Sequence, residues 1–178
     1  MKRKSLIVLS VVVVVGLGVL WKWDKIRIWY LVKPGADLSG CNLYGCDLRG
    51  MNLRKVNLSD ANLGRAYLNN ADLEGADLTG ADLFDSRLEK ANLSNANLKG
   101  ARLSGAWMGG ANLEGANLRD ASLSNSVLEI ANLRAADLTG AKLGGARLFG
   151  TDLRGAKGVN LKGIVSKPKF LPDDPLPE

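Results

Sequence analysis

Residues 71–80 read Ala-Asp-Leu-Glu-Gly-Ala-Asp-Leu-Thr-Gly, which is two successive copies of one five-residue unit. The unit repeats from position 36 to position 155, and its leucine recurs at every fifth residue from Leu38 to Leu153, with Met108 as the only replacement. These 120 residues form 24 units without an insertion or a deletion. A period of five matches neither a helix nor a strand, so the sequence predicts a repeat architecture.

The unit also has a constant order of residue types. The second residue before the leucine is nearly always Ala, the residue before it is usually Asp or Asn, and the second residue after it is often Gly. With this pattern the chain resembles the pentapeptide repeat family. The resemblance implies an all-β solenoid, a right-handed four-sided parallel β-helix in which each unit forms one side and four units form a coil. The Leu and Ala side chains would fill the interior, and 24 units would make about six coils.

The residues that precede the leucines vary with a period of 20, which supports four sides. Two of the four columns with this spacing contain only Asp or Asn. All departures fall on the other two columns, as expected if residues 20 apart share a side. The third column is Asn42, Asn62, Asp82, Arg102, Ser122 and Lys142, and the fourth is Asp47, Tyr67, Arg87, Trp107, Val127 and Arg147.

The N-terminal region, residues 1–33, differs from the repeats at 34–157. A short basic head precedes an apolar run from Leu6 to Trp21, which predicts one transmembrane helix with aromatic and basic residues at its end. A cleaved signal peptide is the alternative, although no A-x-A site precedes the repeats. The basic head favours a repeat domain on the periplasmic or lumenal side, although Lys and Arg flank the run almost equally. The anchor residues are Leu6, Val11, Val15, Leu20, Trp21 and Trp23.

The net charge of +6 does not come from the repeats. Residues 1–33 carry seven basic and one acidic side chain, whereas residues 36–157 carry 14 of each. A neutral rod lacks the basic stripe that binds nucleic acid. It also lacks the acidic character of the DNA-mimicking, topoisomerase-protecting members of the family. We therefore expect no nucleic-acid partner.

The sequence contains no recognisable set of catalytic residues. It contains no histidine, the commonest general base and transition-metal ligand. The repeated Asp and Asn residues suit hydrogen bonds to the backbone at corners, and the glycines suit corners with positive φ. Cys41 and Cys46 are interpreted as small buried residues, with a disulfide as the alternative. We expect no catalysis, cofactor or metal.

Both ends of the repeat array show features of caps. Cys41, Cys46, Met51 and Val56 replace Ala in consecutive units, which predicts one wider coil that closes the N-terminal end; residues 26–32 continue the helix or fold over it. In the C-terminal region, 158–178, the period fails at Gly158, and residues 159–165 are predicted to cover the last coil. Residues 167–178 contain four prolines, which predicts an extended tail, disordered or docked on a partner. Pairing of two copies through a terminal coil is also expected by resemblance.

The irregular columns carry the functional hypothesis. Outward aromatic and Arg residues in one strip are typical of protein-binding surfaces, although they could also merely stack on one another. We therefore expect a membrane-anchored, non-enzymatic scaffold or accessory subunit that binds a protein partner, within a larger membrane complex. The alternative is a DNA-mimicking topoisomerase-protection protein. The candidate protein-binding residues are Tyr44, Tyr67, Phe84, Arg87, Arg102, Trp107, Val127, Lys142, Arg147 and Phe149.

Overall fold

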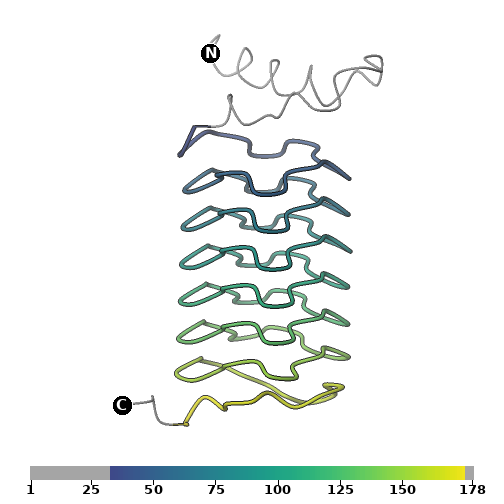
Figure 1. The fold of residues 1–178 in the computed structure, drawn as a ribbon, viewed down its shortest axis with the longest axis vertical. Helices are drawn as coiled ribbons and strands as arrows, with labels where there is room; N and C mark the ends of the chain where they lie inside the picture. Colours follow the sequence, from purple (N-terminus) through teal and green to yellow (C-terminus); the bar gives the residue numbers. More distant parts are fainter. Residues whose placement is uncertain (1–32, 175–178) are drawn as a thin grey trace.

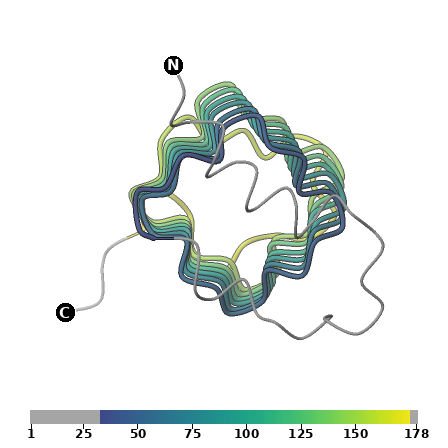
Figure 2. The ribbon, with the colours of Figure 1, turned by 90° about the horizontal axis from the view of Figure 1, so that it is seen from above.

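The computed structural model describes residues 33–174, which wind into a stack of flat coils (Figure 1). Viewed along the stack, the coils superpose into a four-sided outline (Figure 2). Within this range there is no helix, and every β-contact is an isolated parallel bridge between single residues. The bridges join residues 20 apart, from Asp37 with Asn57 to Asp137 with Lys157. The predicted 20-residue coil and the number of coils are therefore confirmed.

Each side of the stack is named here by its first leucine. Side 1 begins with Leu38, side 2 with Leu43, side 3 with Leu48 and side 4 with Leu53, and every twentieth residue after these lies on the same side. The columns of Asp and Asn lie on sides 1 and 4, which we call the regular sides. The columns with departures lie on sides 2 and 3, which we call the irregular sides.

Backbone hydrogen bonds join each coil to the next. On side 1 the N–H of Leu78 donates to the carbonyl of Asn97 at 2.7 Å, and the N–H of Gly80 donates to the carbonyl of Lys99 at 2.9 Å. In return, the N–H of Asn97 donates to the carbonyl of Ala76 at 2.9 Å. Because the backbone alone provides this ladder, the side chain before each leucine is free to vary.

A tight turn forms each corner. The N–H of Ala81 donates to the carbonyl of Leu78 at 3.0 Å, and Gly80 has a φ of 67°, as the third residue of a type II turn requires. The predicted corners with positive φ are confirmed. Within residues 33–174, eleven residues other than Gly also take a positive φ, and among them Ile130, with a φ of 59°, is the β-branched one. That conformation is unfavourable for a β-branched side chain.

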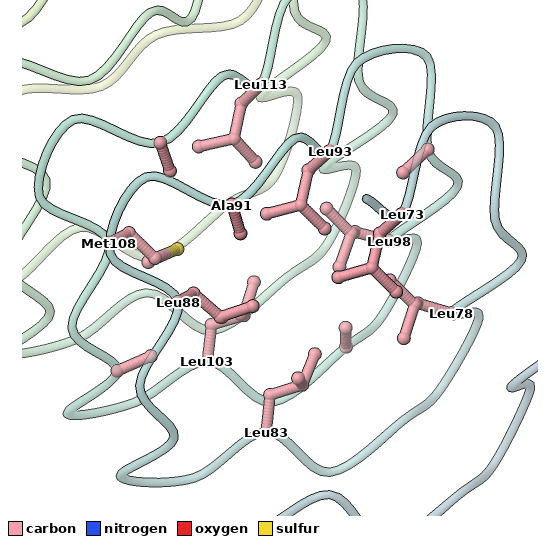
Figure 3. Close-up of a cluster of buried hydrophobic side chains, with 14 of the residues drawn as sticks. Leu73, Leu78, Leu83, Leu88, Ala91, Leu93, Leu98, Leu103, Met108 and Leu113 are labelled. Carbon is pink, nitrogen blue, oxygen red and sulfur yellow. The ribbon is translucent and has the colours of Figure 1, made fainter. Parts of the chain in front are cut away.

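The interior is a pillar of leucine and alanine. Leucines of successive coils turn toward one another inside the stack, and Met108 takes the place of one of them with no exposed surface (Figure 3). Ser86 and Ser126 replace alanine on side 3, and each hydroxyl donates to a backbone carbonyl at 2.7 Å. Among residues 33–174, no buried side-chain nitrogen or oxygen lacks a hydrogen-bond partner. The core therefore tolerates these hydroxyls without a desolvation penalty.

The first coil contains the larger interior residues that the sequence predicts. Cys41, Met51 and Val56 are buried, whereas Cys46 is partly exposed. Both cysteines are free thiols, so the alternative of a disulfide between them is wrong. Burial raises the pKa of both thiols, which lowers their reactivity.

The C-terminal residues close the other end of the stack. Val159, Leu161 and Ile164 pack against the core, which confirms the predicted cover by residues 159–165. Further on, Ser166 forms a bridge with Arg147 on side 3, and Figure 1 shows this segment crossing below the last coil. The cover therefore continues the ladder on part of the last coil.

The prediction for the C-terminal tail needs a correction. As far as Asp174 the tail is neither disordered nor left for a partner, because it lies along side 4 of the last coil. The N–H of Lys169 donates to the carbonyl of Thr151 at 2.9 Å, and the N–H of Gly155 donates to the carbonyl of Pro172 at 2.8 Å. Proline can accept such bonds although it cannot donate them. The last coil would otherwise leave these backbone groups unpaired.

The predicted membrane anchor lies outside the described residues. Leu6, Val11, Val15, Leu20, Trp21 and Trp23 all belong to residues 1–32. Between residues 33 and 174, no helix has the length and apolar character needed to cross a bilayer.

Candidate protein-binding surface

The candidate residues that precede the leucines of side 3 form one continuous outward column. Parallel bridges connect Tyr67 with Arg87, Arg87 with Trp107, Trp107 with Val127 and Val127 with Arg147. Tyr67 and Trp107 keep 43% and 46% of their surface exposed, so neither ring turns into the interior. The ladder places these side chains on one side, in sequence order.

Arginine side chains cover the aromatic rings of side 3. The guanidinium carbon of Arg87 lies 5.7 Å from the centre of the Trp107 ring, and that of Arg49 lies 5.8 Å from the centre of the Tyr67 ring. Both distances fall within the range of cation–π contact. The first contact joins neighbours in one column, in agreement with the expectation that the residues of the strip could stack on one another. The sequence analysis did not predict the second contact, in which Arg49 follows Leu48 in the coil before that of Tyr67.

Carboxylates balance the arginines of side 3. Arg87 lies 3.9 Å from Glu89, and Arg147 forms an ion pair with Glu129 at 2.6 Å. Glu89 also accepts a hydrogen bond from Asn69 at 2.5 Å. These exposed pairs contribute little to stability, because solvent screens them. On side 3, charged and aromatic side chains therefore alternate, and the charges of the paired Arg and Glu residues cancel.

Side 2 carries the remaining candidates in two groups. Near the N-terminal end, the Tyr44 ring lies over Gly64, where an added Cβ would be 3.1 Å from the ring, and 52% of the residue is exposed. One coil below Gly64, the Phe84 ring lies 4.7 Å from the guanidinium carbon of Arg102, which also forms an ion pair with Asp82 at 3.3 Å. The ten candidates therefore lie on two neighbouring sides. Lys142 lies at the C-terminal end of side 2, apart from the aromatic residues of that side.

Ile130 is an exposed apolar residue that the sequence analysis missed. Its side chain is 71% exposed, and its N–H donates to the carbonyl of Phe149, which is itself 67% exposed. Together they extend the apolar surface of side 3 toward the C-terminal end. The available signal was an isoleucine at the corner position, which elsewhere contains Gly, Ala, Asn, Asp, Lys or Arg.

The regular sides use the same outward position differently. On side 4, Asn112 accepts a hydrogen bond from the N–H of Glu114 at 3.2 Å and another from the amide of Asn132 at 3.0 Å, and it donates to Asn92 at 3.3 Å. The expected bond to the corner backbone is confirmed. The ladder of amides between coils was not predicted, although the uninterrupted Asp and Asn column pointed to it.

Ion pairs and hydrogen bonds lower the pKa of several aspartates. On side 3, the side chain of Arg49 donates to Asp47 and lowers the pKa of its carboxyl group. On side 1, the hydroxyl and the N–H of Thr139 donate to Asp137 and, together with Arg119, lower its pKa to about 2. These carboxyl groups are ionised at neutral pH and stabilise corners. Among the described residues, no group of His, Cys, Asp and Glu side chains is arranged to bind a metal ion.

Comparison with known proteins identifies the family of this chain. Models of the pentapeptide repeat match it in eight copies, in overlapping segments that begin at residue 35 and end at residue 163. The chain belongs to the pentapeptide repeat family. The right-handed, four-sided β-helix is the fold of this family. No curated protein sequence matches the chain.

Solved structures of other pentapeptide repeat proteins resemble the coils. A trypsin-treated variant of QnrB1, a plasmid-mediated fluoroquinolone resistance protein, is 24% identical with a TM-score of 0.57, and the match covers 73% of this chain and 74% of QnrB1. HetL, from Nostoc sp. strain PCC 7120, is described as involved in heterocyst differentiation regulation. It is 30% identical, with a TM-score of 0.37 and coverage of 73% and 78%. A protein of the Arabidopsis thaliana thylakoid lumen is 35% identical, with a TM-score of 0.39 and coverage of 61% and 69%. The likeness to QnrB1 concerns the fold alone.

Proposed function

We propose that this protein is a non-enzymatic scaffold or accessory subunit that binds a protein partner on its irregular sides. The observation that carries the proposal is the exposure of Tyr44, Tyr67, Trp107 and Phe149, between 43% and 67%, on two adjoining sides. Aromatic and Arg residues are enriched at the centres of protein interfaces. On the regular sides, the residues before the leucines accept hydrogen bonds from the backbone instead.

Ile130 supports the same proposal from a different direction. A left-handed conformation costs a residue with a Cβ about 1–2 kcal/mol, and Ile130 adopts it while 71% of its surface faces solvent. An isoleucine that is exposed to this extent gives the isolated fold little packing in return. Contact with a partner would bury it together with Phe149.

We extend the proposal to the membrane. The basic head and the apolar run that ends at Trp21 favour a single-span anchor that holds the repeat domain at the bilayer, with a membrane complex as partner. Alkaline carbonate extraction of membranes tests the anchor. The full chain should remain in the pellet, whereas a variant that lacks residues 1–33 should be released. Release of the full chain would contradict the anchor but not the binding surface.

The binding surface is tested with two substitutions in one protein, Trp107→Ala and Arg87→Glu. This variant loses the exposed indole and replaces the guanidinium above it by a carboxylate. We expect the partner that co-purifies with the native protein to be lost, because truncated interface aromatics often cost 2 kcal/mol or more, about 30-fold in affinity. Circular dichroism should be unchanged, since the backbone ladder does not involve these side chains.

The matched control is Arg119→Glu on side 1, which reverses the charge of another exposed arginine. It should leave co-purification unchanged. Ile130→Asn, which suits a positive φ, should raise the melting temperature while weakening binding. Retention of the partner by the Trp107 and Arg87 variant would discard the surface, and equal loss in the Arg119 control would show that charge alone drives association.

A second function has one observation in its favour, the likeness of the fold to QnrB1, a fluoroquinolone resistance protein. By that analogy the chain would be a DNA-mimicking topoisomerase-protection protein. The equal numbers of acidic and basic residues between 36 and 157 argue against DNA mimicry. A DNA supercoiling assay with gyrase, with and without a fluoroquinolone, separates the two functions. Protection by the purified chain would favour this second function.

A further inference from the structure

The backbone ladder stops abruptly at the C-terminal end of side 2. In earlier coils the N–H of Leu103 donates to Ser122 at 2.7 Å and that of Leu123 donates to Lys142 at 2.8 Å. The next equivalent donor, the N–H of Leu143, has no partner among the described residues. The same is true of the N–H of Gly140 at the adjoining corner, although the N–H of Asp120 above it donates to Thr139 at 2.9 Å. Two neighbouring donors therefore point toward the open end.

The course of the C-terminal segment explains why this edge is open. At Gly158, with a φ of 65°, the chain presses against side 1, and an added Cβ would lie 2.4 Å from the Cα of Thr139. From there the chain leaves the edge of side 2. It rejoins the ladder where the N–H of Gly145 donates to the carbonyl of Gly163 at 2.8 Å. The residues between Gly158 and Gly163 therefore do not form the side 2 segment of a seventh coil. We call them the wall, and two of them, Val159 and Leu161, pack against the core.

A pocket of about 360 Å³ lies between this wall and the last coil. Its volume is in the range of sites for small molecules. The lining includes two lysines, Lys142 from side 2 and Lys162 from the wall, and neither has an ion-pair partner within residues 33–174. The full lining is Gly140, Ala141, Lys142, Leu143, Gly144, Gly158, Asn160 and Lys162.

The donors of this pocket have the chemistry of an oxyanion site. Backbone N–H groups that converge beside glycines bind phosphate oxygens in many proteins, and ammonium groups add charge-assisted hydrogen bonds. Asn160 uses its side-chain oxygen to accept the N–H of Lys162 at 3.1 Å, which leaves its amide N–H₂ as a further donor. The lining contains no carboxylate. Asp120 is nearby, since its Oδ1 would be 2.3 Å from a Cβ added to Gly140.

We propose that this pocket binds a phosphate group, such as that of a small phosphate monoester. Two ammonium groups match the double negative charge of a phosphate at neutral pH, and the N–H groups of Gly140 and Leu143 would donate to its oxygens. The site is independent of the aromatic surface of side 3. It would give the scaffold a second ligand at the C-terminal end of the stack (Figure 1).

The test is an NMR titration of the ¹⁵N-labelled full chain with inorganic phosphate at constant ionic strength. Saturable shifts should be confined to residues 140–144 and 158–163, and should include the amides of Gly140 and Leu143. Lys142→Ala combined with Lys162→Ala should weaken binding about tenfold or more, since each change removes a charge-assisted hydrogen bond. Asp120→Asn should tighten binding about twofold, because it removes one nearby negative charge and because Asn tolerates a positive φ.

The matched control combines Lys90→Ala with Lys99→Ala, two exposed lysines outside the pocket. It should leave the affinity for phosphate unchanged. Unchanged amide shifts elsewhere in each spectrum show that a variant remains folded. The proposal is overturned if Gly140 and Leu143 do not shift, or if the control weakens binding as much as the pocket variant. It is also overturned if acetate binds as tightly as phosphate.

Discussion

The regular and irregular sides share one backbone and differ most in what their outward side chains do. On side 4, Asn112 binds the corner backbone and the amides above and below it. On side 3, Trp107 occupies the equivalent position, lies beneath Arg87 and keeps 46% of its surface exposed. Both sides have the same inter-coil bonds, since the N–H of Leu93 and that of Leu88 each donate across at 2.7 Å.

This comparison shows that the fold does not depend on a particular residue before the leucine. Asp and Asn add local stability at that position, but the ladder forms equally well behind Tyr67 or Val127. A side without Asp or Asn before its leucines loses the hydrogen bonds of those side chains, but its outward residues can then vary. We infer that the irregular sides are where this solenoid has room for a function.

The largest expected effect is a loss of stability on truncating a buried leucine, and it tests whether the interiors of the regular and irregular sides are equivalent. Leu103 on side 2 and Leu113 on side 4 are both fully buried. Leu103→Ala and Leu113→Ala should each cost about 2–5 kcal/mol, because each leaves a cavity in a close-packed core. Urea unfolding followed by circular dichroism measures both. Leu103→Met, which imitates the natural Met108, should cost less than about 1.5 kcal/mol. A much larger loss on one side would contradict the equivalence.

A smaller effect should separate the sides at their outward positions. Asn112→Ala removes three hydrogen bonds and should cost about 1–2 kcal/mol. Arg87→Ala on side 3 should change stability by no more than about 0.5 kcal/mol, because its ion pair is exposed. Asn112→Asp keeps the acceptor oxygen and should lie between the two in urea unfolding. Equal losses from the two alanine variants would show that the irregular column also supports the fold.

The smallest effect concerns pH. The pKa of Asp137 is lowered from 3.8 to about 2 by Thr139 and Arg119 in the folded chain, so the unfolded chain binds more protons between these values. Its contribution to stability is complete above about pH 5 and is lost as the pH falls toward 2. Thr139→Val should flatten this part of the profile, because it removes the hydroxyl that donates to Asp137 at 2.6 Å.

The comparison for this measurement is Arg49→Ala on side 3, where the arginine lowers the pKa of Asp47. Its effect should have the same direction, since the pKa of the carboxyl group is again lower in the folded state. Urea midpoints between pH 2 and pH 5 test both variants. An unaltered profile for Thr139→Val would show that Asp137 does not contribute to acid unfolding.

Much of the fold could be predicted from the residues alone. The unbroken leucine spacing placed Leu38 and Leu58 on the same side one coil apart, and the column from Tyr67 to Arg147 follows from that register. The contact between Arg87 and Trp107 was also within reach, because neighbours in a column lie one strand spacing apart. Each of these predictions needs only the five-residue period, the 20-residue variation of the columns and the four-sided coil that the family resemblance implies.

Other features were beyond reach because they do not follow the period. The cover over the last coil places Phe170 against Arg154, with 4.1 Å between the ring centre and the guanidinium carbon, and no spacing rule joins these residues. Arg154 is almost fully buried and also pairs with Asp152 of the last coil. The strained backbone of Ile130 was hidden for a different reason: sequence pattern does not report φ.

The sequence by itself predicted the four-sided coil, the register of its columns and the position of its irregular sides, because the family resemblance implies four units per coil and the residues before the leucines vary with a period of 20. Only the tertiary structure decided how the array ends. The assembled stack decides which backbone donors and acceptors remain unpaired on the last coil. It also decides which of the residues after Gly158 cover these groups and which do not. The cap on side 4 and the open edge at Gly140 and Leu143 both result from the way the C-terminal residues pack on the last coil.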